Sequence, residues 1–204
     1  MPMRKHQSER HHSIVPISCD TLATKSACLA KRGLLLLEQL AARSNRRSGL
    51  GWTPLHIAAI GDHKREAEML ITHGSDVNAR DKFGHTPLFF AKSAYITQVL
   101  VSGGADVNAR RDDGATPLYK AARIGSRQVA RILIDAGADV NAAQDGATAL
   151  HVSARRGHWA VADLLIEHGA NANAVDELGR TPLELAEVGG HEEVAKLIRR
   201  FGGR

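Results

Sequence analysis

The tripeptide Thr-Pro-Leu recurs along this chain at a nearly constant spacing, and this periodicity restricts the possible folds more than any other feature. Four copies and one Thr-Ala-Leu variant begin at Thr53, Thr86, Thr116, Thr148 and Thr181, at intervals of 33, 30, 32 and 33 residues. Periods of roughly 20 to 50 residues are typical of proteins that stack copies of one supersecondary unit. The sequence therefore predicts an array of five units.

Each unit carries signals for helix ends at fixed places. The threonine hydroxyl can accept a hydrogen bond from first-turn amides, and proline fits the first helical position, where its missing N–H costs nothing. A glycine that can end a helix with a positive φ follows each second apolar run. These glycines are Gly74, Gly104, Gly137, Gly169 and Gly202. Each unit is thus predicted to be a helix, a short turn, a second helix and a hairpin-like loop.

Two of the units, GWTPLHIAAIGDHKREAEMLITHGSDVNA and GATALHVSARRGHWAVADLLIEHGANANA, resemble ankyrin repeats. The resemblance covers about residues 49–204, with units near 49–80, 81–110, 111–142, 143–175 and 176–204. It implies an all-α fold, a gently curved solenoid of stacked helix-turn-helix units with projecting hairpin loops. Two short helices cannot bury their apolar faces alone, whereas stacked neighbours can.

The two ends of the array carry different signals. Thr181 and Glu184 match the capping-box pattern, in which two side chains satisfy the first amides of a helix. We therefore expect residues 181–204 to be the C-terminal cap. Residues 21–48 include a stretch with helical apolar spacing and are predicted to be an N-terminal capping helix, and residues 1–20 are predicted to be a disordered basic tail.

The net charge of +5 is unevenly placed. Residues 1–50 carry nine Lys or Arg against three Asp or Glu, whereas the remainder carries eighteen against nineteen. The basic N-terminal region leaves open an alternative function, which is association with nucleic acid or an anionic surface. No aromatic residue interleaves its cations, so a solvated tail is favoured.

Two cysteines, Cys19 and Cys28, offer neither a disulfide framework nor zinc-ligand spacing, which favours a reducing compartment such as the cytoplasm. No run of about eighteen apolar residues predicts a membrane-spanning helix. The sequence also lacks the His-Glu-x-x-His, phosphate-loop and Gly-x-Ser-x-Gly patterns. His56 and His151 occupy repeat-motif positions, which favours a structural role. We therefore expect a non-enzymatic, monomeric chain without cofactor or metal.

The loop tips and the ends of the first helices are not required for packing between units, so they are free to contact a protein partner. In the ankyrin family these line the concave binding surface, so the resemblance implies an adaptor, scaffold or modulator. Position by position it assigns partner contacts to Trp52, Ile60, Lys82, Phe83, His85, Asp112, Asp113, Arg123, Ile124, Gln144, Arg155, Arg156, Glu177, Leu178 and Arg180. Trp52 and Phe83 matter most, because aromatic residues are enriched at binding hot spots. The alternative for both is packing on a neighbouring loop.

The second unit is short. Compared with the other units, three residues are missing between Lys92 and Ser93, including the turn glycine. Ser93 is expected to cap the following helix directly. The unit should then contribute to partner binding only through its loop tip, at Lys82, Phe83 and His85.

Overall fold

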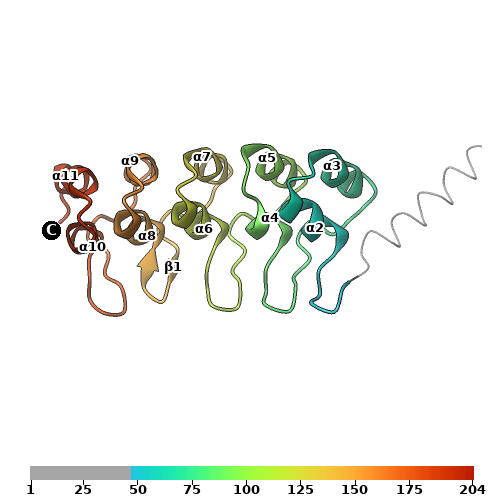
Figure 1. Ribbon diagram of the computed structural model, residues 1–204, viewed down its shortest axis with the longest axis horizontal. Helices are drawn as coiled ribbons and strands as arrows, with labels where there is room; N and C mark the ends of the chain where they lie inside the picture. Colours follow the sequence, from blue (N-terminus) through green and yellow to red (C-terminus); the bar gives the residue numbers. More distant parts are fainter. Residues whose placement is uncertain (1–46) are drawn as a thin grey trace, which may run out of the picture. The chain divides into compact units, whose positions relative to one another are not determined.

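The computed structural model describes residues 47–204. Within them, ten short helices form five pairs that stand side by side in a row (Figure 1). The pairs are α2 Pro54–Gly61 with α3 Lys64–Thr72, α4 Pro87–Phe90 with α5 Ala94–Ser102, α6 Pro117–Ile124 with α7 Arg127–Asp135, α8 Ala149–Arg156 with α9 Trp159–Glu167, and α10 Pro182–Val188 with α11 Glu192–Arg200. The predicted all-α solenoid is confirmed. The tail predicted for residues 1–20, and nearly all of the helix predicted for 21–48, lie outside the described residues.

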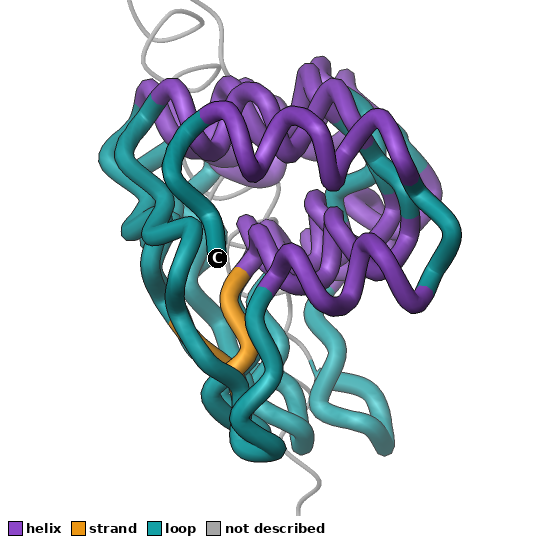
Figure 2. The backbone as a smooth tube through the Cα atoms, turned by 90° about the vertical axis from the view of Figure 1, so that its left-hand side faces the viewer, coloured by secondary structure: helices purple, strands orange, loops and turns teal. Residues whose placement is uncertain are grey.

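The first helices of the five units form one layer and the second helices form another. Long loops extend on the side of the first helices, away from the second layer (Figure 2). We call four of these loops fingers; they are residues 73–86, 103–116, 136–148 and 168–181. Two two-residue strands, β1 Ala143–Gln144 and β2 Ala147–Thr148, pair antiparallel in the third finger. Among the described residues no helix is long and apolar enough to cross a membrane.

The predicted helix ends are found where the sequence placed them. A threonine is the N-cap residue of every first helix, and Thr181 and Glu184 form the capping box of α10. The glycine that follows each second helix has a φ between 79° and 89°. Left-handed backbone of this kind costs glycine little, so these positions fix where the second helices end.

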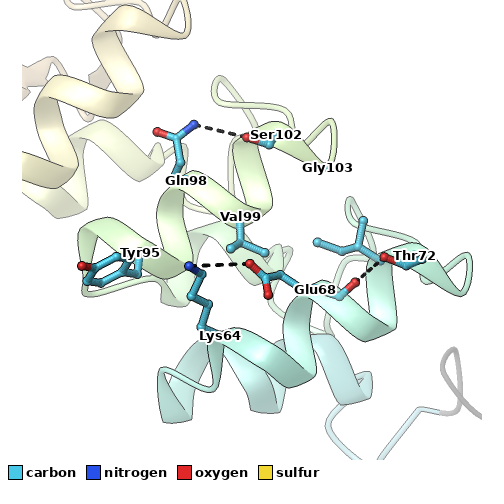
Figure 3. Close-up of a pocket in the computed structure, with 9 residues that line it drawn as sticks. Lys64, Glu68, Thr72, Tyr95, Gln98, Val99, Ser102 and Gly103 are labelled. Carbon is cyan, nitrogen blue, oxygen red and sulfur yellow. Dashed lines mark hydrogen bonds and ion pairs between the residues drawn. The ribbon is translucent and has the colours of Figure 1, made fainter.

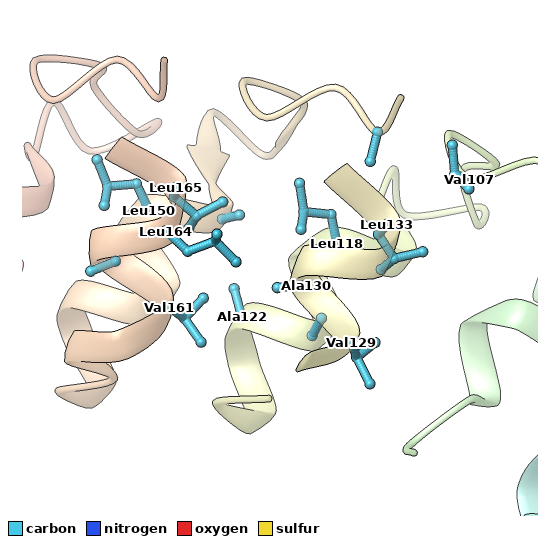
Figure 4. Packing of buried hydrophobic residues seen from close by; sticks show 14 of the residues in the cluster. Val107, Leu118, Ala122, Val129, Ala130, Leu133, Leu150, Val161, Leu164 and Leu165 are labelled. Atoms are coloured by element: carbon cyan, nitrogen blue, oxygen red, sulfur yellow. The ribbon is translucent and has the colours of Figure 1, made fainter. Parts of the chain in front are cut away.

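The core is shared between neighbouring units. The leucine of each Thr-Pro-Leu or Thr-Ala-Leu motif is buried, as are leucines or isoleucines of the second helices (Figure 4). Leu118 and Leu133 of the third unit and Leu150 and Leu165 of the fourth belong to this one cluster and are at most 1% exposed. Burying a leucine stabilises a fold by about 1.5–3 kcal/mol, and here each unit needs its neighbour to achieve it.

Asparagines join each finger to the next. The Asn78 side-chain amide donates to the Gly104 carbonyl at 3.0 Å, and its oxygen accepts from the Asp106 N–H at 2.8 Å. Asn108, Asn141 and Asn173 repeat both bonds one unit further along. The Asn of the repeated motif therefore fixes the spacing between units, as well as forming part of its own turn.

Histidines make a second set of links. The Nδ1 of His56 accepts from the Thr53 N–H at 3.1 Å, so the proton lies on Nε2, which donates to the His85 carbonyl of the next unit at 3.1 Å. His151 makes the equivalent bonds. Burial lowers the pKa of both rings and keeps them neutral, as this pairing requires. The structural role predicted for these two histidines is confirmed.

The short second unit retains its place in the array. Helix α4 has four residues, and the chain passes directly to Ser93, whose hydroxyl accepts from the Ile96 N–H and caps α5 as predicted. The same hydroxyl donates to a carboxylate oxygen of Asp62 at the turn of the preceding unit. This bond holds the shortened turn against its neighbour.

Candidate protein-interaction surface

Most of the side chains assigned to partner binding lie on the fingers or at the ends of the first helices, so they share one side of the array. With Arg180, eleven of them are exposed; the other ten are Lys82, Phe83, Asp112, Asp113, Arg123, Ile124, Arg155, Arg156, Glu177 and Leu178. Trp52, Ile60, His85 and Gln144 are half-buried. Their contacts differ, and these differences indicate which are free to meet a partner.

Trp52 is engaged within the array. Its indole N–H donates to an Asp81 carboxylate oxygen at 3.1 Å, and its ring meets Phe90 edge-on at 5.9 Å between centroids. Phe83, by contrast, keeps 54% of its surface exposed at the tip of the first finger. Of the two aromatics singled out from the sequence, Phe83 is therefore the one available to a partner.

Asp81 builds the finger tip that presents Phe83. Its Oδ1 accepts from the N–H groups of Phe83 at 2.8 Å and His85 at 2.9 Å, and its carboxylate also contacts the His85 ring nitrogen. Burial opposes ionisation of Asp81, but these hydrogen bonds outweigh it and lower its pKa. Asp176 plays the same part in the last finger, where hydrogen bonds from the Arg180 side chain lower its pKa to about 2.

Aromatic rings gather around this finger. Four of the chain's eight Phe, Trp and Tyr residues meet there together with His85; the set, which we call the aromatic cluster, is Trp52, Phe83, His85, Phe89 and Phe90. Centroid distances run from 4.9 to 6.3 Å, within the range of favourable edge and offset contacts. Within the cluster only Phe83 is largely exposed.

A groove of about 210 Å³ adjoins the aromatic cluster. Its charged lining comprises five cations, Arg111, Lys120, Arg123, Arg155 and Arg156, and one carboxylate, Asp113. Phe89 and Gln144 complete its polar and aromatic walls. We call this the basic groove. Its charge contrasts with the near balance of residues 51–204 as a whole, and it brings together five of the residues assigned from the sequence.

Lys120 is the most unusual member of the groove. Its ammonium donates to the Phe89 carbonyl and lies 5.0 and 5.4 Å from the ring centroids of Phe89 and Phe90. Burial lowers the pKa of Lys120 to about 8, and the charges of Lys92 and Arg123 act in the same direction. No carboxylate among residues 47–204 forms an ion pair with it.

Two of the assigned carboxylates on the fingers, Asp112 and Asp113, are partnered. Asp113 pairs with Arg111 at 2.5 Å and accepts from Gln144 at 3.1 Å, and Asp112 pairs with Arg80 at 3.3 Å. The bonds from Gln144 to Asp113 and from Arg80 to Asp112 run from finger to finger and hold the tips in register. The single carboxylate of the basic groove is therefore already neutralised by a cation of the groove.

The next groove along the same side has a different character. Its charged lining comprises three carboxylates, Asp145, Asp176 and Glu177, and two arginines, Arg155 and Arg180, and it has a volume of about 310 Å³. Acidic side chains predominate here. A ligand that suits the basic groove would therefore meet repulsion one unit further towards α10.

The largest groove lies on the opposite layer, between α3 and α5 (Figure 3). It has a volume of about 490 Å³ and exposes Tyr95. Its polar groups satisfy one another: Lys64 pairs with Glu68 at 3.7 Å, and Gln98 bonds to Ser102 at 3.2 Å. Its volume favours this groove as a binding site. Its polar side chains, however, have fewer unpaired hydrogen-bond donors and acceptors than those of the basic groove.

Five residues that line the basic groove lie outside the set assigned from the sequence: Phe89, Arg111, Ala115, Tyr119 and Lys120. A signal for Lys120 exists in the repeat itself, because the four equivalent positions hold Ile57, Phe90, Val152 and Leu185. Aligning the five units position by position would have marked Lys120 as the polar exception.

Among the described residues no three His, Cys, Asp or Glu side chains lie close enough together to hold a metal ion. The arrangement instead offers a ring cluster, cationic donors and finger tips held rigidly by hydrogen bonds. Stacked helix pairs with protruding fingers define a repeat protein whose surface is suited to recognition.

The comparison with known families agrees with this class. The family model "Ankyrin repeats (3 copies)" matches residues 26–111, 66–144, 91–176 and 140–202. The chain belongs to the ankyrin repeat family. Ankyrin repeats are generally protein–protein interaction modules and are typically non-enzymatic.

Curated relatives match over a shorter stretch. Fibronectin type 3 and ankyrin repeat domains 1 protein of Mus musculus is 47% identical over 45 residues, which is 22% of this chain and 13% of the relative. Fibronectin type 3 and ankyrin repeat domains protein 1 of Homo sapiens is 44% identical over 45 residues, with the same shares. The aligned stretch thus spans only a small part of the length of these relatives.

Proposed function

We propose that this chain is a non-enzymatic protein-binding module, an adaptor, scaffold or modulator, whose partner binds across the fingers and the ends of the first helices. The observation that carries the proposal is the exposed Phe83 on a rigid finger tip, linked through the His85 ring to Phe89, which lines the basic groove. The compartment proposed is the cytoplasm, because two cysteines offer no disulfide framework.

The proposal is supported by the separate roles of the side chains that hold the units together and those that remain exposed. The buried leucines, the capping threonines and the linking Asn and His side chains are occupied in holding the units together. Partner binding should order little additional backbone at the finger tips, since Asp81 and Asp176 already fix the backbone there. Aromatic and arginine side chains on such a support are the residue types that dominate binding energies.

The proposal is tested by comparing two double variants of the full chain. Phe83→Ala with Leu178→Ala removes exposed apolar surface from the fingers, where the two side chains are 54% and 73% exposed. Met69→Ala with Tyr95→Ala removes similarly exposed surface, 50% and 70%, from the second helices. Both should leave the helical circular dichroism unchanged.

Partner recovery is then measured by affinity purification and quantitative mass spectrometry. We expect the finger variant to lose the specific partner, by on the order of tenfold or more, because a hot-spot residue contributes 2 kcal/mol or more. The second-helix variant should retain it. The reverse pattern would place binding on the layer of second helices and contradict the proposal.

A further inference from the structure

We propose that the basic groove receives an acidic segment of the partner protein, with one carboxylate seated against the Lys120 ammonium and others on Arg155 and Arg156. This inference rests on the proposed function, because it specifies the chemistry of the partner for the same surface. It concerns residues that the repeat framework does not require.

The groove has many hydrogen-bond donors and few acceptors. Five cations line it against one carboxylate, and that carboxylate is already paired with Arg111. The Nε of Arg111 is buried without an acceptor among the described residues. Buried donors and cations are normally partnered, so their accumulation here is a cost that an incoming anion would offset.

Lys120 carries the strongest part of the argument. It stands at a repeat position that is apolar in the other four units, and it lies among the rings of Phe89 and Phe90. An apolar residue would be more stable there. A residue that departs from the repeat pattern and lowers stability in this way is expected at a functional site.

The helix ends offer a simpler explanation for the arginines alone. Arg123 lies in the last turn of α6, and Arg155 and Arg156 lie in the last turn of α8, where cations interact favourably with the helix dipole. This explanation does not extend to Lys120, which lies in the middle of α6. The shared groove of all four side chains is what points to a ligand.

Charge also restricts where the acidic segment can lie. In the neighbouring groove Arg180 neutralises Asp176, which leaves Asp145 and Glu177 to repel an acidic segment from the α10 side. The aromatic cluster, with Phe83 exposed, borders the other side. The best-fitting occupant therefore has an apolar residue towards the first finger and carboxylates over α6 and α8. A protein segment is favoured over nucleic acid because residues 51–204 carry eighteen Lys or Arg against nineteen Asp or Glu, so the groove is a local cationic feature of the array and not part of a basic face.

The first experiment is selection of binders for the full chain from a random peptide display library. We expect the selected peptides to be enriched in Asp and Glu. A variant with Arg155→Glu and Arg156→Glu should instead select Lys and Arg, since the local charge is reversed. The matched control is Arg65→Gln with Arg127→Gln, two exposed arginines of α3 and α7, which should select acidic peptides as the wild type does.

The outcomes separate this inference from the proposed function. Peptides that lose binding to Phe83→Ala with Leu178→Ala but show no acidic enrichment would overturn the acidic partner and leave the interaction surface intact. Selected peptides that tolerate both the Phe83→Ala/Leu178→Ala and the Arg155→Glu/Arg156→Glu variants would overturn both. Displacement of the selected peptide by duplex DNA or single-stranded RNA at physiological salt would replace the acidic peptide by nucleic acid as the ligand.

A second readout reports on Lys120 itself. The groups that face it are Lys92, His85, Arg111, Asp113, Tyr119, Arg123, Arg155 and Arg156. With its pKa at about 8, Lys120 is about half protonated at pH 8, and a carboxylate beside it favours the protonated form. Binding of a selected acidic peptide should therefore take up a proton.

Titration calorimetry at pH 8, in two buffers of different ionisation enthalpy, measures this uptake. We expect up to about half a proton per complex for the wild type and none for Lys120→Met, which also separates the effect from other groups in the groove. Affinity should fall as the pH rises above 8 in the wild type. A peptide with phosphoserine in place of the key Glu should bind no better. A large gain in its affinity would reassign the groove to phosphorylated segments. Equal proton uptake by Lys120→Met would overturn the role of Lys120.

Discussion

At the scale of single residues, two polar side chains packed within this array have opposite consequences. His56 is buried but uses both ring nitrogens, one to cap its own helix and one to bond the next unit, so it strengthens the stack. Lys120 is half-buried with only a carbonyl bond and two rings for its charge, so it weakens the stack. The difference lies in whether the neighbouring unit supplies a matching partner.

Replacement of Lys120 tests this cost. The folded pKa of about 8 lies below the unfolded value of 10.5, so the folded chain binds fewer protons between these values and gains stability as the pH rises through that window. At pH 7 the full penalty applies. Lys120→Met should therefore raise the free energy of unfolding by about 1–2 kcal/mol at pH 7, with a smaller gain at pH 10. Urea unfolding at both pH values measures it, and a gain independent of pH would contradict the assignment.

At the scale of elements, the sequence was informative wherever a signal acts within one unit. Thr116 at the start of α6 and Gly137 after α7 could be placed because N-caps and left-handed glycines act over a few residues. Links between units were not visible in the same way. The Asn78 amide bonds Gly104 and the Lys120 ammonium bonds Phe89, 26 and 31 residues apart, and no single-unit pattern encodes such pairs.

The same limit applies to the candidate surface. Arg123, Arg155 and Arg156 could be assigned from the ends of their helices, but the closure of one groove around them depends on how α4, α6 and α8 stack. The half-buried state of Trp52 likewise depends on Asp81 of the next unit. Residue types could therefore be predicted from the sequence, whereas their availability to a partner required the stacked units.

Helix α4 provides a prediction at the element scale. Insertion of Arg-Asn-Gly between Lys92 and Ser93 restores the usual unit length and lets α4 extend by another turn. We expect the array to tolerate the insertion or to gain stability, because extension of the helix adds backbone hydrogen bonds while Ser93 remains the cap of α5. Thermal unfolding followed by circular dichroism measures the effect.

Loss of the folded array on insertion would show that the alignment of this unit is wrong. The control is the same insertion between Gly125 and Ser126, where the third unit already has its turn glycine in the left-handed conformation. That insertion lengthens a complete turn and should lower the melting temperature. The comparison distinguishes repair of a short unit from general tolerance of surface insertions.

At the scale of the whole molecule, stability is expected to be distributed unit by unit. Each described unit packs only against its immediate neighbours, through the leucine core, the Asn links and the His links. In such a quasi-one-dimensional array, the free energy is approximately a sum of unit terms and interface terms. A local change should therefore act on one unit and its interfaces, and this has a measurable consequence.

Two core substitutions at different places in the array should destabilise different numbers of units. Leu118 of α6 and Ile198 of α11 are 1% and 0% exposed, and each should cost about 2–5 kcal/mol when replaced by alanine. The third unit packs on two described neighbours and the fifth on one. In hydrogen exchange followed by mass spectrometry, Ile198→Ala should accelerate exchange mainly in residues 176–204, while Leu118→Ala should accelerate it on both sides, from α4 to α9. Equal acceleration throughout residues 47–204 by both variants would show instead that the array opens as a single cooperative unit, and would contradict a unit-by-unit distribution of stability.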